Sequence, residues 1–461
     1  MQVSKRNGVR SLGWCTGFLV ALCSCVALAD DPSAPGPFQA GRKDVTVTRP
    51  NGSTFTATLH YPATAPGVNT PFDPTGGPYP IVSFGHGFLQ PVTQYQSTLG
   101  HLASHGYFAI ASQSQGSIFP SHAAFAADMR SCLDWVIGQG GAGGAYAGSV
   151  ASDRVAFSGH SMGGGCALLA AKDDPRERAV VTLAVADTNP SSIAAAASVA
   201  SATRLIVGSQ DTIVPPASTA APMYANLPGP RQLATIVGGF HCGFTDGDFA
   251  FCDSGSITRA EQLAKTRALM TRFLDLHLRF DAPGVQDEWS GVWGPTSPAV
   301  EGVTLALDPG VTVVPATATV SGPAGGTGSV EVIVTNADPA PRAFDLLGAA
   351  FAPAVTPVLA GGAIAASVGA IAIPPDAQPG DAVVLSARSQ ADGATRGFAV
   401  VTLSPSPPCL DLDGDSVVGA SDLALVLGAW GAAASDADLN RDGIVDATDL
   451  AALLGAWGSC R

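Results

Sequence analysis

Short apolar runs alternate with helical patterns from about residue 43 to residue 280. Most of the later runs are apolar without interruption, which is typical of strands in a sheet covered on both faces. Helical patterns lie between them, as at Ala123 to Ile137 and Arg259 to Arg279. The alternation predicts an α/β fold with a mainly parallel, doubly wound sheet over residues 30–285. The expected strands are Thr54 to His60, Ile81 to Phe84, Tyr107 to Ala111, Arg154 to Ser158, Ala179 to Val185, Leu205 to Gly208 and Leu233 to Val237.

From about Val303 to Leu403 the pattern changes to Val, Thr and Ala runs broken by Gly and Pro, with no helical period. Strands are expected at Val311 to Val320, Ser329 to Asn336 and Ala382 to Arg388. This texture predicts an all-β, immunoglobulin-like sandwich over residues 300–403. Residues 404–408 hold three prolines in five positions and are interpreted as an extended linker.

The remaining residues, 409–461, repeat themselves. Asp411 to Gly431 and Asp438 to Gly458 are similar at an offset of 27 residues, and each ends in Leu-Gly-Ala-Trp-Gly. Such a repeat predicts two copies of one supersecondary unit.

Charge separates the tail from the rest of the chain. The 461 residues carry 23 Lys plus Arg against 37 Asp plus Glu, a net charge of −14, and no basic stripe that would suit a nucleic acid. The tail holds nine Asp and two Arg, which is half of the imbalance in about a ninth of the chain. Nucleic-acid binding is therefore excluded, and the acidic tail needs its own explanation.

The first thirty residues indicate export. Basic residues, the last of them Arg10, precede an apolar run from Leu12 to Leu28 that ends in the small-residue pattern Ala27-Leu28-Ala29. We expect a signal peptide, residues 1–29, and a secreted or cell-surface protein. A membrane anchor and a lipidated Cys25 are the alternatives. No later segment is expected to span a membrane.

Six cysteines remain after such cleavage, and an even number in an exported chain is compatible with disulfides. Cys132 and Cys166 fall in expected helices, where small buried thiols are common. The other four are close in a loop or bracket the tail, which predicts the pairs Cys242 with Cys252 and Cys409 with Cys460.

A nucleophile motif follows the fourth expected strand. Gly159-His160-Ser161-Met162-Gly163 comes directly after Arg154 to Ser158 and opens a small-residue helix. In this strand, sharp turn and helix, G-x-S-x-G presents a serine hydroxyl for attack. An ordinary glycine-rich turn is the alternative, and the strand and helix context disfavours it.

A serine nucleophile needs a general base and a carboxylate that orients the base, here in the order Ser, acid, His. Asp211 follows the second strand after the serine strand, with Asp187 after the intervening strand as its competitor. His241 follows the last expected strand, whereas six histidines precede the serine and His277 lies late in a helix. The expected triad is Ser161, Asp211 and His241.

Two backbone N–H groups are expected to hold the oxyanion. One belongs to Met162, next to the nucleophile. The other comes from Gly85-His86-Gly87-Phe88, after the strand Ile81 to Phe84, and we assign it to Phe88. His86 itself is interpreted as a structural residue of the turn.

These motifs resemble known families. Ile81 to Gln115, with His86-Gly87-Phe88, is similar to chlorophyllases and dienelactone-hydrolase-like α/β-hydrolases. The stretches at 159–165, 208–215 and 223–228 resemble bacterial cutinase-like polyester hydrolases. The resemblance covers the α/β region and includes all three expected triad residues.

The resemblance implies a secreted serine hydrolase that cleaves carboxylic esters through an acyl-enzyme and needs no cofactor for catalysis. Lipid, short-chain and polyester substrates all stay open. The polyester hydrolases carry a substrate-stacking Trp where this chain reads Leu183-Ala184-Val185-Ala186-Asp187. The alternative class is a non-catalytic adhesion or scaffold protein that uses the hydrolase-like fold as a binding platform.

The tail repeats carry oxygen ligands at positions 1, 3, 5 and 12 of a loop, a spacing that suits one hard cation. Gly443 permits the turn at position 6 of the second loop, where the first loop has Ser416. The repeats resemble type I dockerins, which implies two structural Ca²⁺ ions and leaves open a cohesin-like partner or simple surface attachment. Solvated acidic turns are the alternative. The expected ligands are Asp411, Asp413, Asp415 and Asp422, then Asp438, Asn440, Asp442 and Asp449. With the cation bound, the side chains expected to pack together are Leu423, Leu427, Trp430, Leu450, Leu454 and Trp457.

Overall fold

The computed structural model describes most of the chain beyond the expected signal peptide. The described residues are 31–461, except 200, 229, 280–290, 294–295, 316, 339, 376, 392, 394, 407–409, 416, 434, 441 and 460–461. Residues 1–29 and both members of the expected Cys409–Cys460 pair therefore lie outside the described residues. Within the described part, no helix has the length and apolar character needed to cross a membrane.

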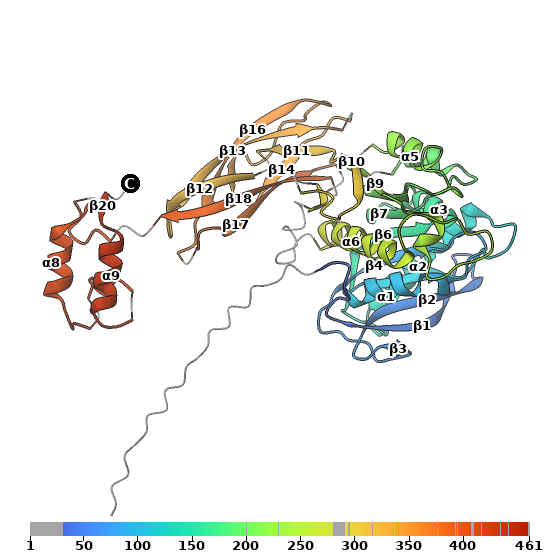
Figure 1. Ribbon diagram of the computed structural model, residues 1–461, viewed down its shortest axis with the longest axis horizontal. Coiled ribbons are helices and arrows are strands. Elements are labelled where there is room, and N and C mark those ends of the chain that lie inside the picture. The colour runs from blue at the N-terminus through green and yellow to red at the C-terminus, as the bar shows by residue number, and fades with distance from the viewer. Residues whose placement is uncertain are drawn as a thin grey trace, which may run out of the picture. The chain divides into compact units, whose positions relative to one another are not determined.

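A ten-stranded sheet forms the first part of the chain (Figure 1). Its order is β10-β9-β8-β7-β6-β4-β5-β2-β1-β3, and the strands from β9 to β5 in this order are parallel, as the sequence predicts. The bounds are β1 (Gln39–Thr48), β2 (Thr54–Ala63), β3 (Gly67–Val68), β4 (Tyr79–Gly85), β5 (Phe108–Ser112), β6 (Val150–His160), β7 (Glu177–Leu183), β8 (Ala202–Gly208), β9 (Arg231–Ile236) and β10 (Val303–Asp308).

Both ends of the sheet extend beyond the sequence prediction. β1 pairs antiparallel with β2. The sequence does not predict this strand, because its charged and polar residues face solvent. β10 pairs antiparallel with β9. We expected the second domain to begin at residue 300, but this sheet includes Val303–Asp308. An antiparallel edge strand on a parallel sheet is common in such folds.

Helices cover both faces of this sheet. α2 and α3 pack on one face, where Phe125, Met129 and Leu168 are fully buried, and α1 and α6 pack together on the other, where Leu99 and Phe273 are fully buried. Every residue of α3 is buried, because its small side chains let it lie close over the centre of the sheet. The bounds are η1 (Val92–Tyr95), α1 (Gln96–Ser104), α2 (His122–Gly140), α3 (Met162–Ala171), α4 (Ser192–Ala196), α5 (Ala220–Asn226), η2 (His241–Phe244) and α6 (Arg259–Leu278).

Two four-stranded sheets form the next part, and their apolar side chains share one core. This confirms an all-β region, and its immunoglobulin-like type remains an interpretation. The first sheet has the order β11 (Val311–Val314), β13 (Thr327–Asn336), β16 (Ile364–Ala372) and β15 (Ala350–Ala352). The second has the order β12 (Thr317–Pro323), β18 (Arg396–Ser406), β17 (Ala382–Ser389) and β14 (Phe344–Leu347).

The expected single strand from Val311 to Val320 is wrong. The chain leaves the first sheet after Val314 and enters the second at Thr317, where β12 runs parallel to β18. Pro315 lies between them and has no N–H to donate to a strand ladder. The proline therefore marks the crossing between sheets.

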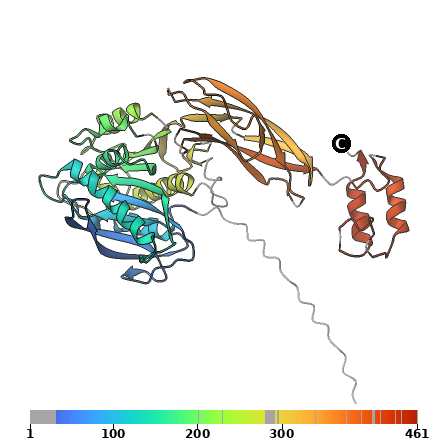
Figure 2. The same ribbon diagram turned by 180° about the vertical axis from the view of Figure 1, so that it is seen from behind.

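The tail holds two short helices, α8 (Ala420–Gly428) and α9 (Ala447–Gly455), which lie side by side (Figures 1 and 2). A two-stranded pair, β19 (Val417–Val418) and β20 (Gly458–Ser459), joins the two ends of the repeat. The core consists of Val418, Val426, Ala437, Val445 and Leu453, with Leu423 and Leu450 packed against it.

Part of the expected tail core is therefore wrong. Trp430 and Trp457 are 49% and 50% exposed, and Leu427 and Leu454 are 52% exposed. Each helix is only nine residues long and buries one narrow stripe, so side chains on the opposite side stay in water.

Three histidines are buried in the first part of the chain without charge. Burial lowers the pKa of His60 on β2 to about 4 and that of His277 on α6 to about 3. Burial also lowers the pKa of His160 well below its usual value. The Nε2 of His277 accepts a hydrogen bond from Trp293 Nε1 (3.2 Å), which protonation would remove.

These histidines predict acid lability. An unfolded histidine binds a proton below about pH 6.5, whereas the buried forms do not, so unfolding takes up protons as the pH falls. The buried histidines should leave the free energy of unfolding at its maximum above about pH 6.5. Between that pH and about pH 4, each histidine should lower it by about 1.4 kcal/mol per pH unit. Urea midpoints followed by far-UV circular dichroism measure this slope.

His277→Gln should remove about one proton from the uptake on unfolding, which lowers the slope by about 1.4 kcal/mol per pH unit. His122→Gln is the matched control, since His122 is only partly buried, and it should leave the slope nearly unchanged. A midpoint that stays constant between pH 7 and pH 5 would contradict the prediction.

Candidate active site

Ser161 lies in a sharp turn between β6 and α3. Its backbone has φ 54° and ψ −119°, a conformation that a non-glycine residue rarely adopts. The Ser161 N–H donates to the carbonyl of Leu183 (2.9 Å), and the Ser161 carbonyl accepts from the N–H of Ala186 (3.1 Å). The strand β7 and the residues that follow it thus hold the strained turn in place.

Three glycines make this turn possible. A Cβ on Gly159 would lie 2.3 Å from the carbonyl oxygen of Gly163, and a Cβ on Gly163 would lie 2.1 Å from the carbonyl oxygen of Gly85. Real Cβ atoms do not approach backbone so closely. The absence of side chains therefore brings the end of β4 against the start of α3.

Asp211 and His241 meet at the ends of neighbouring strands. His241 Nδ1 lies 2.8 Å from Asp211 Oδ2, and both side chains are buried. The other carboxylate oxygen of Asp211 accepts the N–H groups of Ile213 (3.0 Å) and Val214 (2.7 Å). The carboxylate is therefore fixed by its own loop and by the imidazole.

Asp187, the competitor for the acid, has a different set of contacts. Its carboxylate accepts the hydroxyl of Ser191 (2.9 Å) and the N–H of Ile193 (3.1 Å), at the start of α4. Asp187 is thus the anion at a helix N-terminus, whereas Asp211 contacts the imidazole.

The three expected triad residues share one edge of the sheet. Ser161, Asp211 and His241 follow the carboxyl ends of the parallel strands β6, β8 and β9. The ring of His160, next to Ser161, lies against the ring of His241, with centroids 4.6 Å apart. Ligand sites of α/β sheets form at this edge.

The expected oxyanion donors follow β4 and begin α3. Phe88 is 46% exposed, while Met162 is buried. Among the described residues, neither the Phe88 N–H nor the Met162 N–H donates to a backbone carbonyl. Within the described part of the chain, neither group is therefore committed to a backbone carbonyl outside the helices and strands.

Tyr95, on η1, links the loop after β4 to the turn at Ser161. The Gly87 N–H donates to the Tyr95 oxygen (3.0 Å), and the Tyr95 hydroxyl, with its own proton, lies 2.9 Å from His160 Nδ1. Burial raises the pKa of Tyr95, which keeps this proton on the phenol. Sequence reasoning missed this residue, because an aromatic in a loop gives the same signal as a core residue.

His86 ties the loop after β4 to the loop after β5. Its ring nitrogens lie 2.8 Å from the carbonyl oxygens of Gly87 and Ser114, and its ring packs against Phe125. Both nitrogens therefore have backbone partners, which agrees with a structural role.

A cavity of about 630 Å³ opens beside the oxyanion loop. It is lined from β1, β2 and the loops after β4 and β5, by residues that include Arg42, Thr58, Leu89, Gln90 and Gln113. None of the three expected triad residues is among those that line it. The cavity therefore adjoins the loop after β4 without being formed by the expected triad.

Large apolar side chains are exposed at the same edge of the sheet. They follow the carboxyl ends of β4, β5, β8 and β9, and two of them, Phe119 and Phe251, are 86% and 97% exposed. Exposed groups of this size on one side of a protein are typical of binding surfaces. This apolar rim consists of Phe88, Leu89, Ile118, Phe119, Ile213 and Phe251.

The cysteines of the first part agree with expectation. Cys242 and Cys252 form a disulfide, which confirms the predicted pair. Cys132 and Cys166 are free and buried.

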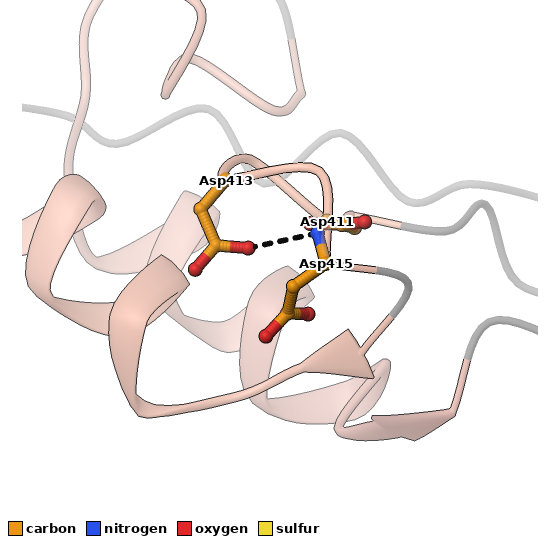
Figure 3. Close-up of side chains that lie close together, drawn as sticks. All are labelled: Asp411, Asp413 and Asp415. Carbon is orange, nitrogen blue, oxygen red and sulfur yellow. Dashed lines mark hydrogen bonds between the residues drawn. The ribbon is translucent and has the colours of Figure 1, made fainter.

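In the tail, three carboxylates of the first repeat lie together (Figure 3). Ligand oxygens of Asp411, Asp413 and Asp415 fall within 4.8 Å of one another. The closing carboxylate, Asp422, accepts the N–H groups of Leu412 (2.7 Å) and Gly419 (2.7 Å). These N–H groups, foremost that of Gly419, hold the pKa of Asp422 below its usual value. The expected metal ligands of this repeat are all carboxylate oxygens, which fits Ca²⁺.

The second repeat uses the same geometry 27 residues later. Asp449 accepts the N–H groups of Leu439 (2.7 Å) and Asp446 (2.8 Å), and Gly443 has a φ of 98° at the position where a turn was expected. Ser416, the corresponding residue of the first repeat, lies outside the described residues.

Comparison with known proteins identifies the family of the first part. Residues 29–287, more than half of the chain, match a family described as "PETase: PET hydrolase-like". The chain is also 29% identical over 216 residues to the bis(hydroxyethyl) terephthalate hydrolase of Streptomyces coelicolor. That match covers 45% of this chain and 65% of the relative. The strained serine turn and the paired Asp and His agree with this family match. The chain belongs to the PET hydrolase-like family of ester hydrolases.

Proposed function

We propose that the chain hydrolyses carboxylic esters through an acyl-enzyme on Ser161. The observation that carries this proposal is the 2.8 Å contact between His241 Nδ1 and Asp211 Oδ2, beside a serine held at positive φ. With Nδ1 bound to the carboxylate, Nε2 of His241 is the nitrogen left to accept a proton.

In the first step, Ser161 Oγ attacks the ester carbonyl carbon and its proton passes to His241 Nε2. The N–H groups of Phe88 and Met162 hold the oxygen that becomes negative. Asp211 keeps the imidazole in the tautomer that can accept the proton and stabilises the imidazolium that forms.

In the second step, the tetrahedral intermediate collapses, the C–O bond to the alcohol breaks, and His241 gives its proton to the leaving alkoxide. Water then attacks the acyl-enzyme with His241 again as base, which releases the acid and restores the Ser161 hydroxyl. These steps need no metal or organic cofactor.

We propose esters with an apolar or aromatic acyl part, polyesters included, as the substrate class. The apolar rim at the same edge of the sheet as the triad, the family and the terephthalate ester named for the relative support this class. The aromatic side chains of the rim would take over the contacts of the Trp that this chain lacks.

We further propose export and a calcium-bound, dockerin-like tail. The basic and apolar pattern of residues 1–29 and the Cys242–Cys252 disulfide support an oxidising, extracellular environment. For the tail, the three gathered carboxylates and the repeated helix-capping aspartates support two Ca²⁺ sites. The resemblance of the tail to dockerins implies a cohesin-like or cell-surface partner.

Ser161→Ala tests the proposed chemistry. Hydrolysis of p-nitrophenyl esters should fall by about three orders of magnitude or more with the fold intact, because the hydroxyl is the point of covalent attachment. Labelling by a fluorophosphonate probe should disappear with it. Labelling that persists in the variant would move the nucleophile elsewhere.

The two aspartates can be compared in matched variants. Asp211→Asn should lower kcat by about 10⁴-fold, because the amide favours the wrong tautomer of His241. Asp187→Asn should leave kcat within about twofold, since it changes a helix cap outside the triad. Steady-state kinetics on one ester decide the matter, and the reverse ranking would give the role to Asp187.

Calcium titration calorimetry on the full chain tests the tail. Wild type should bind two Ca²⁺ ions, and Asp413→Ala should lose one because the first loop loses a ligand. Asp436→Asn, an exposed tail aspartate outside the expected ligand set, is the control and should keep both. Ester hydrolysis should persist in chelator. Absence of Ca²⁺ binding would refute the calcium tail, and loss of hydrolysis in chelator would refute the metal-free mechanism.

A further inference from the structure

One carboxylate outside the triad joins the two loops that carry Asp211 and His241. Asp253 Oδ2 accepts the N–H groups of Thr212 (3.2 Å) and His241 (2.9 Å), and its Oδ1 accepts the N–H of Cys242 (3.0 Å). Thr212 follows β8 and His241 follows β9. The Asp253 side chain therefore bridges the loop of the acid and the loop of the base.

These contacts are not those of a local turn. The three donors lie 41, 12 and 11 residues away from Asp253 in the sequence. An aspartate that only caps its own turn bonds N–H groups two or three residues on. Asp253 instead collects donors from two separate loops.

The segment that carries Asp253 is itself held in place. Cys252, the preceding residue, forms the disulfide with Cys242. Phe251, one residue earlier, has a φ of 68°, which costs free energy for a bulky side chain and persists where surrounding contacts fix the backbone. The disulfide thus anchors Asp253 next to the residue that follows His241.

His241 is fixed from its other side by α6. The fully buried Gln262 accepts the Phe240 N–H on Oε1 (2.9 Å) and donates from Nε2 to the Phe240 carbonyl (2.8 Å). The peptide groups before and after the base therefore both bond to side chains. The His241 and Asp211 loops also meet where the Gln210 N–H donates to the Gly239 carbonyl (2.8 Å), and Asp253 adds a second bridge at the peptide groups of His241 and Thr212 themselves.

We propose that Asp253 is a positioning residue that holds Asp211 and His241 in hydrogen-bond register, with the Cys242–Cys252 disulfide as its anchor. The inference rests on the proposed ester hydrolysis. Asp253 acts through the backbone of His241 and Thr212 and does not touch the reacting atoms. Catalytic groups must be held within a fraction of an ångström, so loosening this bridge lowers turnover rather than substrate binding.

The test compares two carboxylates of the same loop. Asp253→Asn keeps the size of the side chain but replaces one accepting oxygen with an NH₂ group. Asp246→Asn is the matched control, because Asp246 accepts the Ser97 N–H (2.9 Å) and hydroxyl on α1 and makes no hydrogen bond to His241 or Thr212 among the described residues.

On a p-nitrophenyl ester, kcat of the full-length Asp253→Asn variant should fall about 10- to 100-fold with KM within about twofold. Asp246→Asn should leave both within about twofold. Equal losses in the two variants, or an unchanged kcat for Asp253→Asn at a temperature where both are folded, would overturn the proposal.

A second readout does not depend on activity. The proton between His241 Nδ1 and Asp211 should give a far-downfield NMR resonance in wild type and in Asp246→Asn, and the resonance should be lost in Asp253→Asn. Its persistence in Asp253→Asn would overturn the proposal. Wild type inactive on every ester would refute the proposed function, while the resonance would still decide the role of Asp253.

Variants without the disulfide test its role as the anchor of Asp253. Cys242→Ser with Cys252→Ser should lower kcat in the same direction as Asp253→Asn, and the three changes together should cost less than the sum of the separate losses, because they loosen one bridge. Additive losses would show that the disulfide does not act through Asp253 and would overturn its role as the anchor.

Discussion

The close approach of two backbones, at Gly85 and Gly163, is the constraint on which the site depends. A Cβ on Gly163 would lie 2.1 Å from the Gly85 carbonyl oxygen, so only glycine allows the start of α3 to press against the end of β4. This contact places the oxyanion loop beside the nucleophile turn. Ser161 then adopts its strained backbone at a fixed distance from the loop that carries Phe88. Tyr95 reinforces the arrangement, because its hydroxyl connects Gly87 to His160.

The base reaches this point from the other side through a separate set of restraints. Gln262 and Asp253 hold the peptide groups on either side of His241, and Asp211 binds its ring. None of these side chains needs to be mobile for the proposed steps. The site is thus assembled by loops at one edge of a sheet, with the catalytic geometry supplied by backbone hydrogen bonds to a few buried or half-buried polar groups.

The sequence predicts the parts of this site that follow chain order. A glycine-flanked serine after a strand, an aspartate two strands later and a histidine after the next strand are visible without coordinates, and so is the Cys242–Cys252 pair. Tyr95, Asp253 and Gln262 are not visible, because each acts through contacts with residues far away along the chain. The same limit applies to the fold. The parallel strands are predicted from continuous apolar runs, whereas the charged and polar residues of β1 hide its pattern. The residues of β10 do have a strand pattern, but the sequence does not show which sheet they join, and the sheet crossing at Pro315 likewise depends on which partner strands are available.

The central claim is that the nucleophile, the base and two backbone donors surround one reacting carbon. A crystal structure of the chain after reaction with an alkyl phosphonate ester tests it most directly, because the tetrahedral phosphorus resembles the intermediate of ester hydrolysis. We predict phosphorus bonded to Ser161 Oγ, the phosphonyl oxygen within hydrogen-bond distance of the N–H groups of Phe88 and Met162, and His241 Nε2 facing Ser161 Oγ. A phosphonate on another residue, or a phosphonyl oxygen turned away from both N–H groups, would contradict it.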